Sequence, residues 1–592
     1  MKQFLKIVFA SMTGYALIML TFSLIMIGVI ASVATFSKKN VVIVSQNTVL
    51  HLKLDEIISD RSSSNPLSNF NFATMNSNNT PGLNEILESI EKAKTDENIK
   101  GIYLDLGDMP SGIATLEEIR NALLDFKKSE KFIISYGEDY TQKAYYIASV
   151  SDEIYLNPEG TVVFKGLNGE IMFYKGLLEK LDVDVQVIRH GKFKSAVEPF
   201  ILDKMSDANK EQTLKYISSI WDHLLDGISL SRNLTKDDLN LIADSLKIQT
   251  AEDAVTYKLV DKLMYKDEFL AELRSKLGIG ENDNISMLSI NKYVDAPDNN
   301  KKDKSGRKDK IAVIYALGPI QSGKGDDETI GSETISAAIR KARLDSTIKA
   351  VVLRINSPGG SALASDVIWR EVVLTKKVKP VVASMGDVAA SGGYYIACAA
   401  SKIIASPNTI TGSIGVFGLV PNLKEMFSNQ LGITFDNVKT NNYSDFGTLN
   451  RPLSESETSI YQANVENVYQ TFISHVAEGR NMSTDQVDSI GQGRVWSGAD
   501  AKEIGLIDEF GGLTKAIETA VQLAKIENYR IVSYPEQKDP FTKILEELSG
   551  ESDNSALLKK EFGDVYEYYK FVNDVKNMEG VQARLPYLIN IY

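Results

Sequence analysis

Cysteine and histidine are scarce in this chain of 592 residues, which holds one cysteine, Cys398, and four histidines. A single thiol cannot close an internal disulfide or build a cysteine metal cluster. The histidines are far apart in the sequence, and no HExxH or similar ligand spacing occurs. The sequence therefore predicts chemistry without a metal or another cofactor.

Positive charge is also in deficit, since 65 Lys and Arg residues face 78 Asp and Glu residues and the net charge is -13. Nucleic-acid binding normally needs a clustered basic surface that replaces phosphate counterions, so we expect no nucleic-acid partner. A hydrophobic content of 43% and a charged content of 24% are typical of a folded protein. The length predicts at least two cores.

The first long run without charge extends from Ile7 to Ser37 and consists mainly of apolar residues. It exceeds the roughly 20 residues that cross a bilayer. We therefore expect residues 1–39 to be an N-terminal transmembrane signal anchor. Cleavage stays open, because Ser32-Val33-Ala34 is compatible with a signal peptidase site, although cleavable signals have shorter apolar runs. Lysines flank both ends of the run and do not fix its orientation.

An internal duplication organises the rest of the chain. Gly101-Ile-Tyr-Leu-Asp-Leu corresponds to Ala350-Val-Val-Leu-Arg-Ile, and Lys143-Ala-Tyr-Tyr-Ile-Ala-Ser to Gly392-Gly-Tyr-Tyr-Ile-Ala-Cys, both at an offset of 249 residues. A charged stretch without apolar periodicity separates the copies. The predicted parts are a first repeat at 40–297, a linker at 298–310, a second repeat at 311–535 and a C-terminal extension at 536–592.

Both repeats are expected to adopt a parallel α/β fold. In the second repeat, short β-rich runs begin at Ile311, Ala350 and Val378 and alternate with helical spacing such as Thr334–Arg343. Ser454–Glu478 predicts a long helix, because apolar residues recur mostly at steps of three and four.

Ser391 is the best candidate for a nucleophile. It stands between a predicted strand and an apolar helical stretch, in Asp387-Val-Ala-Ala-Ser-Gly-Gly-Tyr-Tyr. Such a turn projects the hydroxyl from the end of the sheet. The amides of Gly359, Gly360 and Gly392 are the candidate donors to an oxyanion. The alternative is that these small residues only permit tight turns.

The first repeat lacks this chemistry. Gln142 stands at the position of Ser391, Lys143 at that of Gly392, and Pro110-Ser111 at that of Gly359-Gly360. One copy has therefore kept the nucleophile, and the other is free to act as a structural partner or to donate a second catalytic group.

A serine hydroxyl needs a base, and here the sequence resembles a known family. The segment His190-Gly-Lys-Phe-Lys-Ser-Ala-Val-Glu-Pro-Phe is similar to the one that carries the lysine base in the long, two-domain signal peptide peptidase A family. The matching lysine is Lys194. Residues 356–361, 387–395 and 411–416 resemble further active-site motifs of that family. His190 remains a competing base.

The resemblance implies tandem Clp-protease/crotonase-like domains, a Ser391/Lys194 dyad and a homotetramer. Ser413 would orient Lys194. The substrates would be cleaved signal peptides and other extended apolar peptides. The catalytic body would lie on the periplasmic side of a bacterial inner membrane, held by a single-pass anchor. Because a free lysine has a pKa near ~10.4, burial must lower the pKa of Lys194 before it can act as a base.

Two other functions stay open from the sequence alone. A crotonase-like enzyme acting on acyl thioesters would use similar glycine-rich loops. An inactive membrane scaffold would have no catalytic activity, and its duplicated domains would only assemble into a ring. The serine, the lysine and the glycines favour the peptidase.

Overall fold

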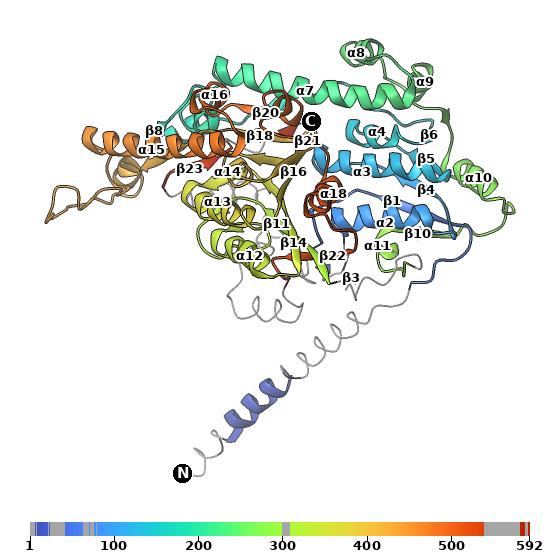
Figure 1. Ribbon diagram of the computed structural model, residues 1–592, viewed down its shortest axis with the longest axis horizontal. Helices are drawn as coiled ribbons and strands as arrows, with labels where there is room; N and C mark the ends of the chain where they lie inside the picture. The colour runs from blue at the N-terminus through green and yellow to red at the C-terminus, as the bar shows by residue number, and fades with distance from the viewer. Residues whose placement is uncertain are drawn as a thin grey trace.

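The computed structural model describes residues 6, 9–21, 23, 42–62, 70–71, 76–77, 80–298, 308–537, 580–585 and 590–591. Three segments lie outside these residues: most of the expected span at residues 1–39, the linker from 299 to 307, and the extension from 538 to 579. Among the helices that the structure describes, none has the length and apolar character to cross a membrane. The described chain forms two α/β units placed side by side (Figure 1).

The first unit is built on a six-stranded parallel sheet with strand order β10-β1-β4-β5-β6-β9. Its strands are β10 (Met287–Ser289), β1 (Thr48–Lys53), β4 (Ile99–Asp105), β5 (Phe132–Gly137), β6 (Glu153–Leu156) and β9 (Lys262–Leu263). Helices α2 (Leu83–Thr95), α3 (Ile113–Phe126) and α4 (Gln142–Ala148) contribute to the apolar core on one face. Helix α10 (Lys266–Leu277) packs on the other, as a parallel sheet requires.

The second unit repeats this arrangement. Its order β22-β11-β14-β16-β17-β21 reproduces β10-β1-β4-β5-β6-β9, and β18 and β20 extend the sheet from β16. The strands are β22 (Tyr529–Tyr534), β11 (Asp309–Leu317), β14 (Ile348–Ser357), β16 (Val381–Ala390), β17 (Lys402–Ala405), β21 (Glu509–Phe510), β18 (Ile410–Gly412) and β20 (Val495–Ser497). Helices α12 (Ser332–Leu344), α13 (Ala362–Lys376) and α18 (Leu513–Ala524) cover it. The predicted α/β class and duplication are confirmed.

Two equivalent helices of 26 residues, α7 (Asp207–Arg232) and α15 (Glu455–Arg480), each reach the other repeat. Helix α7 packs on β20 of the second repeat, and α15 packs on β8 (Asp184–Arg189) of the first. The helix predicted at Ser454–Glu478 is thereby confirmed. Ile460, one of the apolar residues whose spacing predicted this helix, is nevertheless 47% exposed and lies outside its buried face. The two repeats therefore exchange helices rather than meet at a simple plane.

A third sheet, which the sequence did not predict, combines distant segments in the order β13-β12-β15-β23-β19-β8. Besides β8 its strands are β13 (Ile330–Gly331), β12 (Ile320–Gln321), β15 (Gly359–Ser361), β23 (Gln582–Arg584) and β19 (Phe417–Asn422). Strand β8 belongs to the first repeat, and β23 belongs to the C-terminal tail. The sheet therefore joins both repeats at the segment that contains the glycine-rich loop.

Each repeat also caps a helix of the other. Asp387 accepts hydrogen bonds from the amide (2.9 Å) and hydroxyl (2.6 Å) of Thr115 in the first turn of α3. Glu118, on α3, accepts one from the amide of Leu513 at the start of α18 (2.7 Å). A glycine stands at the N-cap of both helices, and a Cβ there would come within 2.2 Å of the capping carboxylate. These caps fix the repeats in one relative position.

The buried guanidinium of Arg354 lies beside these caps. Its Nε contacts Asp60, its Nη2 lies 2.7 Å from Glu118 Oε1, and its Nη1 donates to Ser384 Oγ (3.0 Å). Burial raises the pKa of Glu118, and the charge of Arg354 opposes that shift. Strand β14 is thus tied to the first repeat through ionic contacts that water does not reach.

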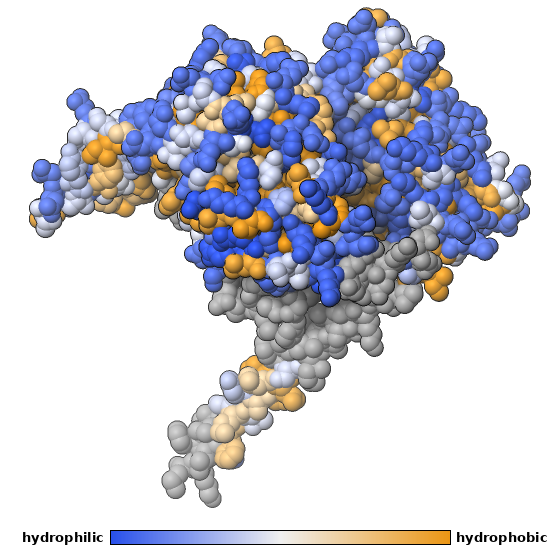
Figure 2. Space-filling view, viewed as in Figure 1, coloured by the Kyte–Doolittle hydropathy of each residue, from blue (hydrophilic) through white to orange (hydrophobic). Residues whose placement is uncertain are grey.

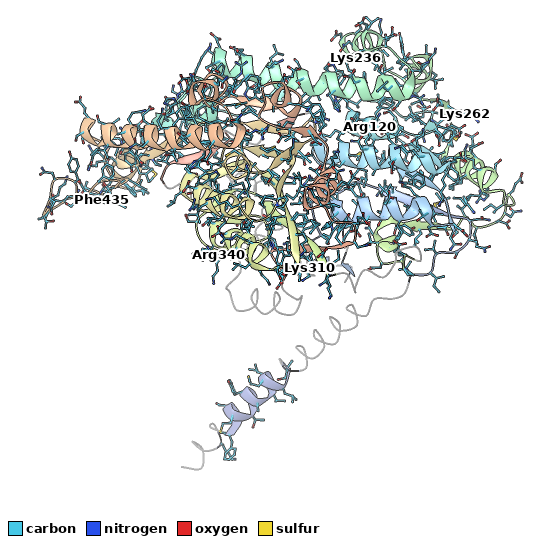
Figure 3. All side chains as sticks on the ribbon, viewed as in Figure 1. Arg120, Lys236, Lys262, Lys310, Arg340 and Phe435 are labelled. Carbon is cyan, nitrogen blue, oxygen red and sulfur yellow. The ribbon has the colours of Figure 1, made fainter. Side chains whose placement is uncertain are left out.

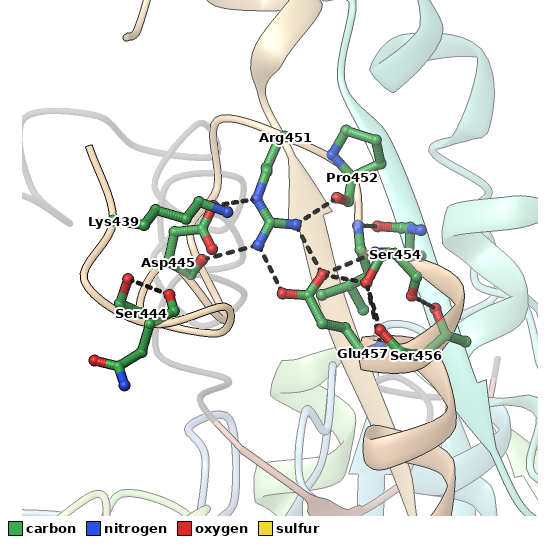
Figure 4. Close-up of polar contacts among 12 residues, drawn as sticks. Lys439, Ser444, Asp445, Arg451, Pro452, Ser454, Ser456 and Glu457 are labelled. Carbon is green, nitrogen blue, oxygen red and sulfur yellow. Dashed lines mark hydrogen bonds and ion pairs between the residues drawn. The ribbon is translucent and has the colours of Figure 1, made fainter. Parts of the chain in front are cut away.

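An arm at residues 423–454 leaves the body between β19 and α15. Figure 2 shows it at the left of the molecule, and Figure 3 labels Phe435 on it. At its base Arg451 donates to Asp445 (2.7 Å) and Glu457 (2.6 Å), and Lys439 pairs with Asp445 (2.6 Å) (Figure 4). Glu457 also closes the capping box with Ser454 at the start of α15. The arm is therefore fastened to α15.

Arg354→Met is expected to lower the free energy of unfolding by about 3–5 kcal/mol, because it leaves two buried carboxylates without their cation. Urea denaturation followed by circular dichroism measures the change. Lys175→Met is the control, since its ion pair with Glu179 lies at the surface and should contribute little. A similar loss in both variants would contradict the structural role of Arg354.

Candidate active site

Ser391 lies directly after β16, at the N-cap of α14 (Gly392–Ala397). Its backbone has φ 55° and ψ -113°, a conformation that non-glycine residues rarely adopt. The Ser391 amide donates to Gly412 O (2.8 Å), which helps to hold this turn. The side chain is fully buried. A strand, a strained turn and a helix therefore position the hydroxyl, as they do at many active-site serines.

Lys194 reaches the same point from the first repeat. It follows β8, which pairs antiparallel with β19, and its side chain has no exposed area. Its Nζ lies 2.9 Å from Ser391 Oγ, 3.0 Å from Ser413 Oγ and 3.2 Å from Ser413 O. A Cβ on Gly493 would lie 2.6 Å from Lys194 Cα, so this close approach requires a glycine. The structure thus brings Ser391, Lys194 and Ser413 together.

Burial lowers the pKa of Lys194 well below its usual value. A neutral amine has two N–H donors and one lone pair. The three neighbours of Nζ can use both donors and the lone pair. The amine then donates to Ser413 O and Ser413 Oγ, and its lone pair accepts the hydroxyl proton of Ser391. The geometry therefore suits removal of that proton by the lysine.

Gln212 on α7 holds the lysine segment, a role that the sequence analysis missed. Its Nε2 donates to Phe193 O (3.1 Å) and Ser195 Oγ (2.8 Å), on either side of Lys194. Its Oε1 accepts from the amide of Val495 on β20 (3.1 Å). One buried amide thus links the lysine segment to the second repeat. A lone glutamine within a helix has no motif around it, so only the fold identifies it.

The candidate oxyanion glycines lie against each other. Gly359 has φ 94°, and a Cβ on it would lie 2.7 Å from the amide nitrogen of Gly392. The Gly359 amide donates to Ser357 Oγ (3.1 Å). Gly360 pairs with Ile320 across β12. The two glycine motifs, 32 residues apart at Gly360 and Gly392, therefore meet beside the serine.

The histidines make contacts of another kind. His190 Nδ1 lies 2.7 Å from Glu466 Oε2, and its ring stacks on Tyr469 at 3.8 Å. The other three each pair with one carboxylate: His51 with Asp105, His223 with Glu117 and His475 with Asp366. Among the described side chains no cluster of three or more His, Cys, Asp and Glu residues is arranged to hold a metal. His190 is thus held by α15.

The equivalent turn of the first repeat is filled. Gln142 Oε1 accepts from the amides of Lys165 and Gly166, both at 3.0 Å, and its Nε2 donates to Gly166 O (3.1 Å). Lys143 Nζ donates to Ser111 O (3.1 Å). These side chains bond to the backbone in place of a nucleophile, so the first repeat supplies the lysine but no second site of this kind.

Known proteins match this architecture. Residues 125–280 and 374–527 match the sequence pattern of peptidase family S49. "Protease 4" of Salmonella typhi is 37% identical over 479 residues, which are 79% of this chain and 76% of that protein. "Serine protease SPPA, chloroplastic" of Arabidopsis thaliana is 34% identical over 85% of this chain and 74% of its own.

A shorter relative aligns with part of the chain. It is "Putative signal peptide peptidase SppA" of Enterococcus faecium, which is 31% identical over 235 residues, 39% of this chain and 68% of that protein. The family pattern occurs once in each repeat, and the longer relatives align with most of the chain. The chain therefore belongs to peptidase family S49 and is a serine peptidase.

Proposed function

We propose that the chain is a membrane-anchored endopeptidase in which Ser391 is the nucleophile and Lys194 the general base. The observation that carries this proposal is the 2.9 Å distance between Lys194 Nζ and Ser391 Oγ, with both side chains fully buried. A buried lysine that is neutral at pH 7 is a competent base for a serine hydroxyl.

In this mechanism Lys194 removes the proton of Ser391 as Oγ attacks the carbonyl carbon of a peptide bond. The tetrahedral intermediate collapses, the C–N bond breaks, and the ammonium of Lys194 returns the proton to the leaving amine. Lys194 then deprotonates a water molecule that hydrolyses the acyl ester and regenerates Ser391. Ser413 orients the amine. The amides of Gly360 and Gly392 stabilise the oxyanion. The Gly359 amide donates to Ser357 Oγ instead, and the missing side chain of Gly359 leaves room beside the Gly392 amide.

The proposed substrates are extended apolar peptides, including signal peptides that remain in the membrane after their cleavage. Strands β15 and β19 flank a position at which a peptide strand completes the third sheet, which is how many proteins bind extended peptides. The Enterococcus faecium relative is named as a signal peptide peptidase, which supports the same substrates for this chain. The apolar run from Ile7 to Ser37 supports an anchor in the bacterial inner membrane, with the catalytic body on its periplasmic side.

We also propose a homotetramer. The arm exposes apolar side chains that a monomer leaves in water: Leu431, Ile433, Phe435, Val438 and Tyr443 are 44% or more exposed. Several exposed apolar side chains on one segment are typical of a protein interface. Further copies of the chain are its proposed partners.

Ser391→Ala and Lys194→Met should each lower kcat for a fluorogenic apolar peptide by roughly 10²–10⁴-fold or more, because each removes a group that acts in the transition state. The full chain in detergent is assayed, with melting curves to establish folding. His190→Gln is the matched control and should stay active. An inactive His190→Gln together with an active Lys194→Met would assign the base to the histidine instead.

The activity should rise with pH through one ionisation well below the ~10.4 of a free lysine, because only the neutral amine accepts a proton. The kcat/KM profile of the wild type measures it. A profile whose ionisation lies at the free-lysine value would contradict a desolvated base.

The pH dependence of the free energy of unfolding provides a second measure of the pKa of Lys194. Between the lowered pKa of folded Lys194 and ~10.4, the unfolded chain binds the extra proton, so wild-type stability rises with pH. The stability of Lys194→Met relative to wild type should therefore fall as pH rises through this window. Urea titrations at several pH values measure the difference, and a difference independent of pH would show that the lysine is already protonated in the fold.

Removal of residues 1–39 should move the protein from the membrane pellet to the soluble fraction, because the apolar run is the proposed anchor. Fractionation after a carbonate wash, followed by immunoblotting, measures the distribution. Protease added to spheroplasts should degrade the full-length body if it faces the periplasm. A full-length protein released by carbonate would refute the anchor, and one protected in intact spheroplasts would refute the orientation.

A further inference from the structure

The turn at residues 491–493, which leads into β20, forms a wall against the lysine segment. The Phe193 amide donates to Gln492 O (3.0 Å). A Cβ on Gly493 would lie 2.6 Å from Lys194 Cα, so the two backbones are in direct contact. The position of Lys194 in the site therefore depends on the position of this turn.

The same turn holds the segment that carries Ser413. The Gly493 amide donates to Ile414 O (2.7 Å), and the Ser413 amide donates to Arg494 O (2.7 Å). Lys194 and Ser413, which are 219 residues apart in the chain and 3.0 Å apart at Nζ and Oγ, thus rest on one short segment. A displacement of the turn would move both the amine and the hydroxyl that orients it.

The turn has an unfavourable backbone conformation. Gln492 has φ 51° and Gly493 has φ 81°, and residues with a side chain rarely adopt a positive φ. Such a conformation persists where the surrounding structure holds it in place. The turn at 491–493 therefore needs contacts from outside itself.

Tyr469 on α15 supplies these contacts. Its hydroxyl accepts a hydrogen bond from the Gln492 amide (3.1 Å) and donates one to Asp488 Oδ1 (2.6 Å), on α16 (Thr484–Ile490). Asp488 Oδ2 also accepts from Gln492 Nε2 (3.2 Å). Tyr469 has no exposed area. One buried hydroxyl thus links the turn to two helices.

The charged groups around Tyr469 keep its hydroxyl protonated. Burial and the Asp488 carboxylate raise the pKa of Tyr469 above its usual value, and Glu466 on the same helix acts in the same direction. His190 stacks on the ring at 3.8 Å. At pH 7 and well into the alkaline range, the hydroxyl is therefore a donor to Asp488 and an acceptor for the Gln492 amide.

The first repeat has the donor of this pair but not the acceptor. Helix α7 begins at residue 207 and α15 at residue 455, an offset of 248, so Trp221 corresponds to Tyr469 and Asn240 to Asp488. Trp221 Nε1 donates to Asn240 Oδ1 (2.9 Å). An indole N–H only donates, whereas a hydroxyl also accepts. The tyrosine thus adds an acceptor for the turn, in the repeat that holds the nucleophile.

We propose that Tyr469 is a positioning residue for the base Lys194: its hydroxyl holds the turn at 491–493, and the turn fixes the amine and its partner Ser413. This inference rests on the proposed function. Proton transfer depends on the accurate placement of the amine and on the exclusion of water from it. Without the hydroxyl, the Gln492 amide loses its acceptor, the turn relaxes, and water comes closer to the amine.

Tyr469→Phe tests this role, because it keeps the ring on His190 and removes only the hydroxyl. In the full chain in detergent, kcat for the fluorogenic peptide at pH 7 should fall roughly 10–100-fold, since a small misplacement of a catalytic group has effects of this size. KM should not change, because the groove is left intact. The ionisation in the kcat/KM profile should move up toward the ~10.4 of a free lysine, so the deficit should shrink as pH rises.

Tyr461→Phe is the matched control, since it makes the same change about 12 Å away along α15. The Tyr461 ring stacks on Phe446 at 4.9 Å, and the variant should have the kcat of wild type. Asp488→Asn keeps an oxygen that accepts from the Tyr469 hydroxyl and should retain most of the activity, whereas Asp488→Leu should behave like Tyr469→Phe. Melting curves establish that each variant is folded.

The rate at which a fluorophosphonate labels Ser391, measured over the same pH range, reports on the base without a bound peptide. Tyr469→Phe should be labelled more slowly at pH 7 and should approach wild type at alkaline pH. A Tyr469→Phe enzyme with the kcat of wild type, or one with a lower kcat and an unmoved ionisation, would overturn the positioning role. If Lys194→Met is inactive in that case, the peptidase proposal stands, whereas an active Lys194→Met would overturn both proposals.

Discussion

The exclusion of water from one lysine amine is the constraint on which the architecture depends. In the proposed mechanism Lys194 acts as a base only while its amine is neutral, and desolvation is what lowers the pKa of that amine. Its side chain comes from the first repeat and its partner Ser391 from the second. The repeats must therefore close on each other without a gap. The reciprocal caps at Asp387 and Glu118 and the buried contacts of Arg354 provide that closure.

The duplication explains how such a shared site arises from two similar folds. Each repeat extends one long helix over the other, and the first also lends β8 to the sheet that contains β15 and β19. Where the second repeat has Ser391, the first has Gln142, whose side chain bonds to the backbone. The first repeat does not supply a nucleophile. It supplies the segment around Lys194, which is buried against the second repeat. Gln212 holds this segment against β20.

The sequence predicted those features that depend on a local pattern of residue types. Repeated apolar runs predicted the parallel sheets, and the three- and four-residue spacing predicted α15. Glycine motifs and the resemblance around Lys194 selected side chains that the fold brings together. The third sheet, Gln212 and the Asp60–Arg354 contact were not predictable, because they join residues separated by hundreds of positions and carry no local pattern. The position of β23 was missed for the same reason.

The tail connects these two themes. Lys194 and Ser391 are fully buried in a structure in which β23 lies between β15 and β19, beside the glycine that follows Ser391. Without a peptide strand between β15 and β19, the groove would offer fewer apolar contacts beside Ser391 and would admit solvent more readily. Water near the amine would favour the ammonium form and raise the pKa of Lys194. Peptide binding would then complete the base as well as deliver the substrate. In the proposed mechanism, a peptide strand in this groove would therefore supply part of the dry environment that a neutral lysine requires.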